Sequence, residues 1–432
     1  QNSRTNAFKA HLSMGLSKAD VYSHPAHSSM MKDYDVIVVG GGPGGSTAAR
    51  VAADRGLRVL LLDMAAFPRD KVCGDAVSGK ALRVLRELGV ESKIAAKPHA
   101  PVKGVHFSSP NGTILKVPIP ADQPSAYCIR RQVLDNILFE HATKVCEFRE
   151  STQVVSLMRE NEKVVGVKVA DLSTKQTREI TANIVIGADG TNSVVAQHLN
   201  ANELPANHAC VAVRAYFENV LELSDHIEIH FTQDSLPGYF WIFPLENGQA
   251  NVGGGMVLSE IQKRHVHLPQ LLEKIIQSPR FAARFKEAKK MGETQGWTLP
   301  FGSHRRTLSF DGALLCGDAA ALIDPFTGEG IGNALLSGKI AGETVAAAHE
   351  KNDFSRTFLM QYENEIWNTL GAEFETSFTL QKWARYPFLL NMAIKKAATK
   401  PRIRSVLSGM LLDEQPRQEL VKPLNWFKLL VS

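Results

Sequence analysis

Four residues in the first part of the chain have the types and the spacing that a phosphate-bearing ligand needs. Gly40, Gly42 and Gly45 form the pattern G-x-G-x-x-G, and Asp63 follows them. The first glycine permits a tight turn, the second lets the main chain approach a pyrophosphate, and the third lets a helix pack closely on a strand. The Asp63 carboxylate can accept hydrogen bonds from ribose hydroxyls. These residues predict a dinucleotide site, with an ordinary glycine turn as the alternative.

The neighbouring segments predict the elements that would hold these residues in place. Residues 34–39 form an apolar, β-branched run, residues 46–55 form a helix of small residues, and residues 58–62 form a second apolar run that ends at Asp63. A strand, a turn, a helix and a second strand in about 30 residues is the usual size of such a unit. The helix would direct its free amides at the phosphates. Enzymes that use NAD and enzymes that use FAD share this unit, so it does not choose between them.

Later glycine-rich segments also follow apolar runs and contain aspartates. Asp189 and Gly190 follow the apolar residues 184–186, and Asp318 follows the apolar residues 313–316. Taken alone, Asp189 could be a turn residue and Asp318 could cap a helix. A further turn then opens the next helix with the residues Pro325, Gly328, Gly330, Ile331 and Gly332.

Together these segments resemble the FAD-dependent family that shares the fold of para-hydroxybenzoate hydroxylase. The resemblance implies that Asp318 binds the ribityl chain of FAD and that the turn from Pro325 directs a helix toward the flavin pyrimidine. It also implies that Arg131 lies at the flavin edge and that Asp189 and Gly190 belong to the family's middle motif. Amides at a helix N-terminus stabilise negative charge, which reduced flavin carries near N1 and O2. The ordered motifs therefore predict non-covalent binding of FAD.

Two further motifs resemble those of the geranylgeranyl reductase family. Residues 68–74 read P-R-D-K-V-C-G, and residues 239–244 read Y-F-W-I-F-P before the glycines of residues 253–255. Members of that family saturate isoprenoid chains of archaeal lipids, chlorophyll precursors or menaquinone. The resemblance implies that Cys73 and Gly74 lie at the flavin face, near the reacting double bond.

The aromatic residues of the second motif fit a long apolar substrate. Tyr239, Trp241 and Phe243 alternate along a strand, so they point to one face. They could line a channel for a hydrocarbon chain, or they could fill the core of the sheet. Cys73 could likewise be a small buried hydrophobic residue. Because it lies in the family motif, we expect its thiol to help deliver a proton.

The expected reaction is the saturation of C=C bonds in a geranylgeranyl or polyprenyl chain. Reduced flavin would supply hydride to one alkene carbon, and a proton would be added to the other. The sequence has no second dinucleotide fingerprint, so an external reductant such as NADPH or ferredoxin would have to reduce the flavin. The expected partners are an isoprenoid lipid and, with ferredoxin, an electron-donor protein.

Two other functions remain open for a chain with these motifs. One is a flavin monooxygenase or halogenase of the same fold, although a halogenase would carry W-x-W-x-I-P where residues 239–244 read Y-F-W-I-F-P. A hydroxylase gives no reason for the motif at residues 68–74. The other is a non-catalytic flavin-binding protein, against which the presence of Cys73, Arg131 and Asp318 argues.

Composition argues against several further classes of protein. Five cysteines are scattered singly with no CxxC pair, so neither a metal site nor a disulfide framework is expected. A net charge of +5 is compatible with phosphate ligands or an anionic membrane surface, and no nucleic acid is expected. No apolar run is long enough to span a bilayer, and residues 1–30 lack the apolar core of a secretory signal. We therefore expect a disordered leader followed by a cytoplasmic enzyme.

A basic segment near the C-terminus predicts contact with a membrane surface. Residues 376–412 interleave lysines and arginines with aromatic and aliphatic residues and contain no acidic residue. Such a mixture favours the interface of an anionic leaflet. The alternative is a solvated basic face on helices whose apolar side packs against the substrate cavity.

These elements predict an α/β fold with a Rossmann-like FAD-binding domain, an antiparallel β-sheet substrate domain and C-terminal helices. Residues 78–90, 131–145 and 268–290 should be helical, residues 151–186 should contain a meander of strands, and residues 208–256 should form antiparallel strands. The expected domains are residues 31–105, 126–200 and 305–350 for FAD, residues 106–125 and 201–304 for the substrate sheet, and residues 351–432 for the helical region.

Overall fold

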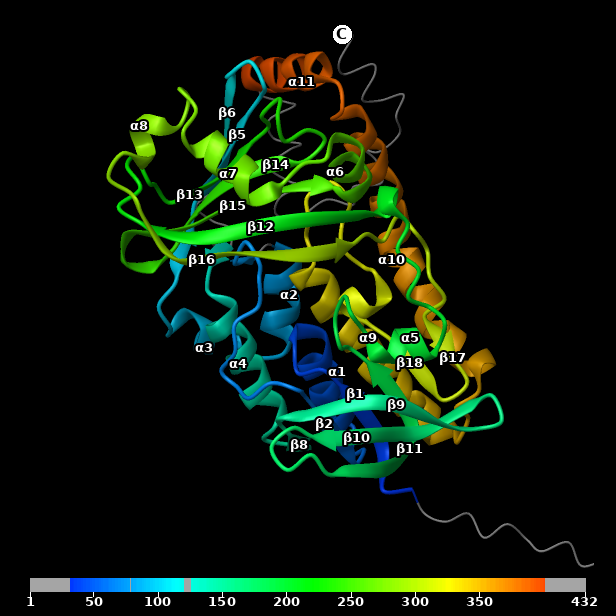
Figure 1. Ribbon diagram of the computed structural model, residues 1–432. Coiled ribbons are helices and arrows are strands. Elements are labelled where there is room, and N and C mark those ends of the chain that lie inside the picture. The colour runs from blue at the N-terminus through cyan, green and yellow to red at the C-terminus, as the bar shows by residue number, and fades with distance from the viewer. Residues whose placement is uncertain (1–31, 78, 120–125, 401–432) are drawn as a thin grey trace, which may run out of the picture. The chain divides into compact units, whose positions relative to one another are not determined.

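The structure is a computed structural model that describes residues 32–77, 79–119 and 126–400. One sheet has eight strands, namely β1 (Tyr34–Val39), β2 (Val59–Leu62), β8 (Glu147–Arg149), β9 (Thr152–Glu160), β10 (Lys163–Asp171), β11 (Thr177–Gly187), β17 (Ser309–Phe310) and β18 (Ala313–Leu315). A path through it runs β17-β18-β11-β1-β2-β8, and β10 pairs with both β11 and β9 (Figure 1). The predicted meander over residues 151–186 is confirmed.

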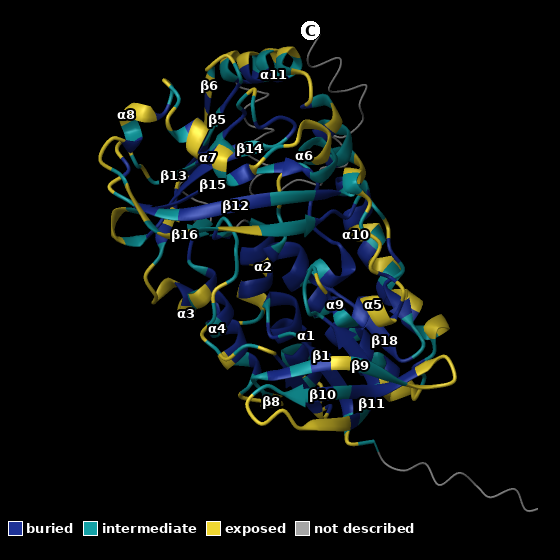
Figure 2. Ribbon diagram, viewed as in Figure 1, coloured by how far each residue is buried: buried dark blue, intermediate teal, exposed yellow. Residues whose placement is uncertain are grey.

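Strand β1 lies inside this sheet. Its residues Val36, Ile37 and Val38 are fully buried, as expected for a strand that is covered on both faces (Figure 2). β1 pairs in parallel with β2 and with β11, and β11 pairs in parallel with β18. The carboxyl ends of these four strands therefore meet at one edge of the sheet, and the glycine-rich turns of the sequence follow at that edge.

Helices α1 (Pro43–Asp54) and α9 (Ile331–Lys351) pack against each other through small residues. A Cβ atom on Gly338 would lie 2.1 Å from the carbonyl oxygen of Gly44. Only glycine permits two helix backbones to approach so closely. α1 begins at Pro43, a residue suited to a first helical turn because its missing N–H has no partner there anyway.

The second sheet has seven strands in the order β16-β12-β15-β14-β13-β5-β6. They are β5 (Gly104–Ser108), β6 (Ile114–Pro118), β12 (Ala209–Glu218), β13 (His226–His230), β14 (Tyr239–Pro244), β15 (Gln249–Val257) and β16 (Lys289–Pro300). The prediction of antiparallel strands over residues 208–256 is confirmed. The expected antiparallel sheet contains one parallel pair, because β13 pairs in parallel with β5.

One face of this sheet is covered by helices. Phe240 and Ile242 of β14 pack with Leu272 of α7 (Leu268–Ile276) and Phe285 of α8 (Ala282–Phe285). The prediction that residues 268–290 are helical is therefore wrong for part of this range. The chain leaves the helical conformation between α7 and α8, and β16 already begins at Lys289.

The remaining elements connect the two sheets and extend the chain to its described end. They are the strands β3 (Ala76–Val77), β4 (Ala100–Val102) and β7 (Ala126–Cys128), the helices α2 (Gly79–Glu87), α3 (Glu91–Ala95), α4 (Arg131–Ala142), α5 (Val194–His198), α6 (Leu258–Arg264), α10 (Arg356–Trp383) and α11 (Pro387–Thr399), and the short helices η1 (Ala206–His208), η2 (Glu246–Gly248) and η3 (Gly317–Ala320). The strands β3, β7 and β4 form a small third sheet.

The division of the chain into the three predicted domains stays a prediction, and the expected leader at residues 1–30 lies outside the described residues.

Candidate active site

Turns with the predicted functional residues follow four parallel strands. Gly40 follows β1, Asp63 follows β2, Asp189 lies just after β11, and Asp318 lies just after β18. In an open α/β sheet, ligands bind outside the carboxyl ends of the strands. The fold therefore brings together motifs that are far apart in the sequence.

The fingerprint glycines have two different structural roles. Gly40 has a φ of +102°, and a Cβ atom there would lie 2.3 Å from the Ala188 carbonyl oxygen. A Cβ atom on Gly45 would lie 1.8 Å from the Gly40 carbonyl oxygen. The Cβ position of Gly42, in contrast, meets only the Arg69 guanidinium, at 3.5 Å. Gly40 and Gly45 are needed for packing, whereas Gly42 leaves a cradle at the start of α1 that a ligand can fill.

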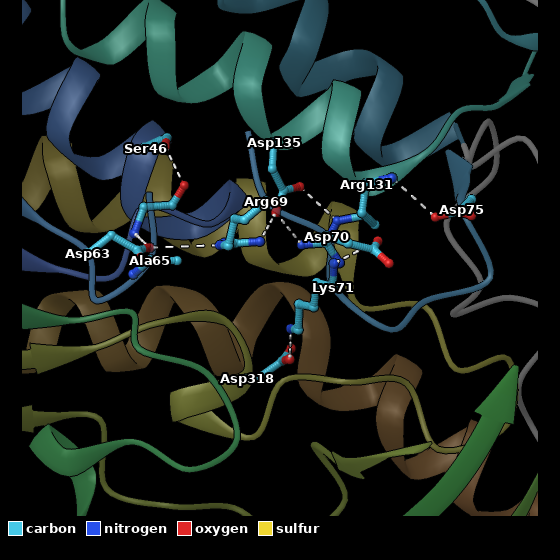
Figure 3. A network of polar contacts seen from close by, with 11 residues as sticks. Ser46, Asp63, Ala65, Arg69, Asp70, Lys71, Asp75, Arg131, Asp135 and Asp318 are labelled. Carbon is cyan, nitrogen blue, oxygen red and sulfur yellow. Dashed lines mark hydrogen bonds and ion pairs between the residues drawn. The ribbon is translucent and has the colours of Figure 1, made fainter. Parts of the chain in front are cut away.

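Charges around this cradle suit a dinucleotide (Figure 3). Asp63 accepts a hydrogen bond of 2.7 Å from the Gly41 amide. Arg69 donates to Asp135 at 2.9 Å, and its Nε atom lies 4.0 Å from Asp63. A guanidinium beside the N-terminus of α1 adds to the attraction of helix amides for phosphate. These residues fit the pyrophosphate and ribose of FAD, and Arg69 is a residue that the sequence analysis did not assign to the cofactor.

Two further ion pairs lie in the same network (Figure 3). Lys71 contacts Asp318 at 2.6 Å, and Arg131 donates two hydrogen bonds of 2.7 Å to Asp135. Burial alone would disfavour the charge of Asp135, but the Arg131 guanidinium lowers the pKa of that carboxyl below its usual value. The segment at residues 68–74 thus contributes positive charge as well as Cys73.

Asp189 makes contacts that the sequence did not predict. Its carboxylate accepts hydrogen bonds from the Ser193 hydroxyl at 2.5 Å and from the amides of Val194 and Val195 at 2.7 and 3.2 Å. The carboxylate thus satisfies two free amides in the first turn of α5, whose N-cap is Ser193. Gly190 follows with a φ of +78°. A role of Asp189 and Gly190 in binding FAD stays a prediction.

An apolar cavity of about 700 Å³ begins beside the start of α1. Its lining includes Pro43 at the start of α1, Arg131 and Asp318, and it also includes residues of α10 and α11. In Figure 1, α11 lies at the far end of the seven-stranded sheet from α1. The cavity therefore extends from the dinucleotide motifs to the C-terminal helices.

The three predicted aromatic residues line this cavity. Tyr239, Trp241 and Phe243 lie on the face of β14 opposite to the helix-covered face. The ring centroids of Tyr239 and Trp241 are 6.0 Å apart, as are those of Trp241 and Phe243. Trp241 and Phe243 are also buried in a core cluster of the sheet, so a role of the three rings in binding substrate stays a prediction.

The turn before α9 meets this aromatic strand. The Tyr239 hydroxyl donates a hydrogen bond of 2.5 Å to the Thr327 carbonyl, and Gly328 has a φ of +74°. Gly332 packs on α2, since a Cβ atom there would lie 3.0 Å from the Ala81 amide nitrogen. Of the residues predicted in this turn, the ones that line the cavity are Pro325, Gly328, Gly330 and Ile331.

Cys73 and Gly74 form part of the cavity wall. Cys73 is half-buried, and burial raises the pKa of its thiol above the usual value, an effect that the Arg131 guanidinium offsets only in part. The thiol is therefore protonated at neutral pH. A Cβ atom on Gly74 would lie 2.9 Å from the ring of Phe243, so glycine lets the motif pack on the aromatic strand.

Sequence reasoning missed polar residues in and behind this wall. Lys80 and Glu373 line the cavity as an ion pair of 3.1 Å, and Lys80 also donates to Asn333 at 2.8 Å. No local pattern connects positions so far apart in the chain. Asp75 is fully buried and follows the Cys73 motif directly, a position that could have drawn attention to it.

Helix α11 covers the cavity on one side and faces solvent on the other. Leu390 and Ile394 line the cavity, whereas Phe388 and Tyr386, the N-cap residue of the helix, are 65% and 54% exposed. Among residues 32–77, 79–119 and 126–400, no helix is long and apolar enough to cross a bilayer, and no cluster of side chains could hold a metal ion. The part of the predicted basic segment beyond residue 400 lies outside the described residues.

Comparison with known proteins identifies the family. The family model for the FAD binding domain matches residues 33–365. The digeranylgeranylglycerophospholipid reductase of Methanosarcina acetivorans is 33% identical over 361 residues, which cover 81% of this chain and 85% of that protein. A geranylgeranyl bacteriochlorophyll reductase-like protein of Thermoplasma acidophilum has a crystal structure with a TM-score of 0.77 and 26% identity, covering 90% of this chain and 98% of that one. A flavin-dependent brominase shares the fold, with a TM-score of 0.74 and 21% identity over 88% of this chain and 94% of its own. The chain belongs to the FAD-binding family that includes the digeranylgeranylglycerophospholipid reductases.

Proposed function

We propose that the chain is an FAD-dependent reductase that saturates C=C bonds in the geranylgeranyl chains of a glycerophospholipid. One observation carries this proposal. A cavity of about 700 Å³ with a largely aliphatic and aromatic lining extends from the FAD motifs to α11, and the thiol of Cys73 lies in its wall. A long hydrocarbon fits such a lining better than a compact polar substrate does. The names of the relatives point to the same substrate class.

The residues that would hold FAD come from all of the predicted motifs. When bound and reduced, FAD supplies hydride for addition to an alkene carbon. In the proposal its pyrophosphate lies at Gly42 and Arg69, and its ribose hydroxyls bind Asp63. The remaining cofactor-binding positions are Gly40, Gly45, Arg131, Asp189, Gly190, Asp318, Pro325, Gly328, Gly330, Ile331 and Gly332.

The cavity residues would position the alkene and provide a proton. Tyr239, Trp241 and Phe243 orient the hydrocarbon chain and exclude water from the site, which favours reduction over side reactions. Cys73 holds a proton on its sulfur at neutral pH and is the proposed proton donor to the second alkene carbon. Gly74 keeps this sulfur close to the aromatic wall.

Two partners complete the proposal. An external reductant, NADPH or a ferredoxin-like protein, reduces the flavin, because the sequence offers no second dinucleotide fingerprint. The lipid comes from a membrane surface that the enzyme touches without spanning it. The exposed rings of Tyr386 and Phe388, with the exposed side chains of Lys382 and Lys395, support contact with an anionic leaflet beside the cavity.

The products formed from an isoprenoid lipid test this function. The enzyme, reduced under anaerobic conditions, is incubated with a digeranylgeranyl glycerophospholipid, and the product is analysed by mass spectrometry. We expect the mass of two hydrogen atoms to be gained for each saturated bond. A product that gains oxygen or halogen when air and halide are admitted, together with no hydrogenated product, would instead identify a monooxygenase or halogenase.

A further inference from the structure

A cluster of polar side chains lies directly behind the wall that contains Cys73. Asp75 is fully buried, and its φ of +66° places it in the left-handed region, which aspartate tolerates better than most residues. Its carboxylate accepts hydrogen bonds from the Arg131 amide at 3.2 Å, from the Tyr216 hydroxyl at 2.9 Å and from Asn251 Nδ2 at 2.8 Å (Figure 3 shows the first). A buried carboxylate is unfavourable without such donors, so this arrangement depends on all three elements that supply them.

The side chain of Asn251 connects the Asp75 carboxylate to two groups in the cavity wall. Its Nδ2 atom also donates to the main-chain carbonyl of Cys73 at 2.7 Å. Its Oδ1 atom accepts a hydrogen bond of 2.9 Å from the indole nitrogen of Trp241. Because Asn251 is fully buried on β15, one amide fixes both the main chain at Cys73 and the ring of Trp241.

The third donor, Tyr216, is itself held firmly. The guanidinium groups of Arg130 and Arg214 lie 4.1 and 4.0 Å from its ring centroid. Arg214 also pairs with Asp70, which belongs to the same motif as Cys73. The cluster therefore connects β12, β15 and α4 to the segment at residues 68–74.

From these contacts we propose that Asp75 and Asn251 are positioning residues for the reduction, which fix Cys73 and Trp241 relative to each other. Neither of the two is among the residues that line the cavity. This inference rests on the proposed function and deepens it, because it explains how two wall residues from distant motifs are kept in one arrangement.

The ionisation of Asp75 gives the proposal a pH signature. Burial raises the pKa of Asp75 to about 6, although Asn251, Tyr216 and Arg214 favour the charged form. Below that pH the carboxyl is protonated and becomes a weaker acceptor for its donors, so reduction should slow as pH falls through about 6. The titratable and charged groups that face it are Cys73, Cys128, Arg130, Arg131, Arg214 and Tyr216.

The decisive variant is Asp75→Asn in the FAD-loaded enzyme, because asparagine keeps the size of the side chain and tolerates a positive φ. We expect unchanged FAD content and substrate KM, and a maximal rate of flavin reoxidation by the lipid that falls about 10- to 100-fold, as misplaced reacting groups cause. The fall in the reduction rate below about pH 6, which we call the acid limb, should disappear. In the oxidised enzyme, alkylation of Cys73 by N-ethylmaleimide is followed on its peptide by mass spectrometry. The pH profile of its rate should shift to lower pH, because the negative charge of Asp75, which raises the pKa of the thiol, is gone.

A milder pair of variants keeps the proposal testable if Asp75→Asn does not fold. Tyr216→Phe removes one donor to the carboxylate and should move the acid limb to higher pH. Tyr362→Phe is the matched control, because it removes a buried hydroxyl that donates to the Leu315 carbonyl at 2.7 Å outside the cavity. It should leave the acid limb in place.

Two results would overturn the positioning role. One is an Asp75→Asn enzyme with wild-type alkylation profile and reoxidation rate, and the other is an identical acid limb in Tyr216→Phe and Tyr362→Phe. The alkylation measurement needs no lipid. If it shifts as expected while the wild type reduces no isoprenoid, the contact of Asp75 with Cys73 is supported and the proposed function is the part that fails.

Discussion

At the scale of single residues, Gly42 is the position that most directly tests where FAD binds. Its Cβ position is open apart from Arg69, so a larger side chain should fit the fold but fill the cradle for the pyrophosphate. We expect Gly42→Leu to keep its circular dichroism spectrum and to lose the flavin absorbance after purification. Full occupancy of FAD in this variant would show that the cofactor does not approach the main chain at Gly42.

Cys73 should act in the reductive step and not in binding FAD. Its thiol is protonated and lies in the cavity wall, whereas Arg69 and Asp63 define the cradle at α1. Cys73→Ala should retain FAD. Its rate of C=C reduction should be lower by about a hundredfold or more, which is the usual effect of removing a positioned proton donor. The rate of flavin reoxidation by the lipid is the measurement. An unchanged rate and product distribution would remove Cys73 from the site.

Residues with a local signal were predictable, and residues defined by distant contacts were not. The spacing of Gly40, Gly42 and Gly45 follows from the turn they form, so the sequence alone indicates it. Asn251 has no such signal, because its function depends on Cys73 and Trp241, which other segments bring to it. The hydrogen bonds of Asp189 likewise depend on the start of α5.

At the scale of elements, the contact between α1 and α9 sets the geometry of the cofactor edge. A Cβ atom on Gly338 would lie 2.1 Å from the Gly44 carbonyl oxygen, so Gly338→Ala should push the helices apart and destabilise the protein by about 1–3 kcal/mol. A helical glycine with different surroundings, Gly371 of α10, is the control. A Cβ atom there meets only the flexible end of Arg305, so Gly371→Ala should be neutral or stabilising by up to about 1 kcal/mol.

Thermal unfolding of the FAD-loaded protein distinguishes these two variants. We expect a lower midpoint for Gly338→Ala and an unchanged or higher midpoint for Gly371→Ala. Equal shifts in both would mean that the close contact of α1 with α9 does not govern stability.

Which segments form strands was easier to predict than which strands pair with each other. Alternation of apolar residues correctly placed the strands within residues 208–256, because it records which face is buried. It carries no information about pairing, so the parallel contact between β13 and β5 was missed. The start of β16 was missed because its first residues, from Lys289, are largely exposed and do not alternate.

At the scale of the whole molecule, the proposal places the enzyme at an anionic membrane surface. We expect binding to liposomes that rises with the content of anionic lipid and falls with salt, since exposed charges are screened over about 8 Å at physiological ionic strength. Phe388→Ser on α11 should weaken binding, because that ring is 65% exposed. Met64→Ser is the matched control, since Met64 is 59% exposed on a segment away from α11. Flotation is the assay, and a protein that stays unbound at low salt would obtain its lipid in some other way.

The central claim is that reduced FAD in this chain passes its electrons to an isoprenoid double bond, and an anaerobic titration tests it most directly. The holoenzyme is reduced with dithionite, freed of excess reductant and titrated with a digeranylgeranyl glycerophospholipid while the flavin spectrum is recorded. The account predicts that the oxidised spectrum returns without oxygen and that one double bond is saturated for each flavin reoxidised. A flavin that stays reduced in the presence of the lipid and is reoxidised only when air is admitted would contradict it.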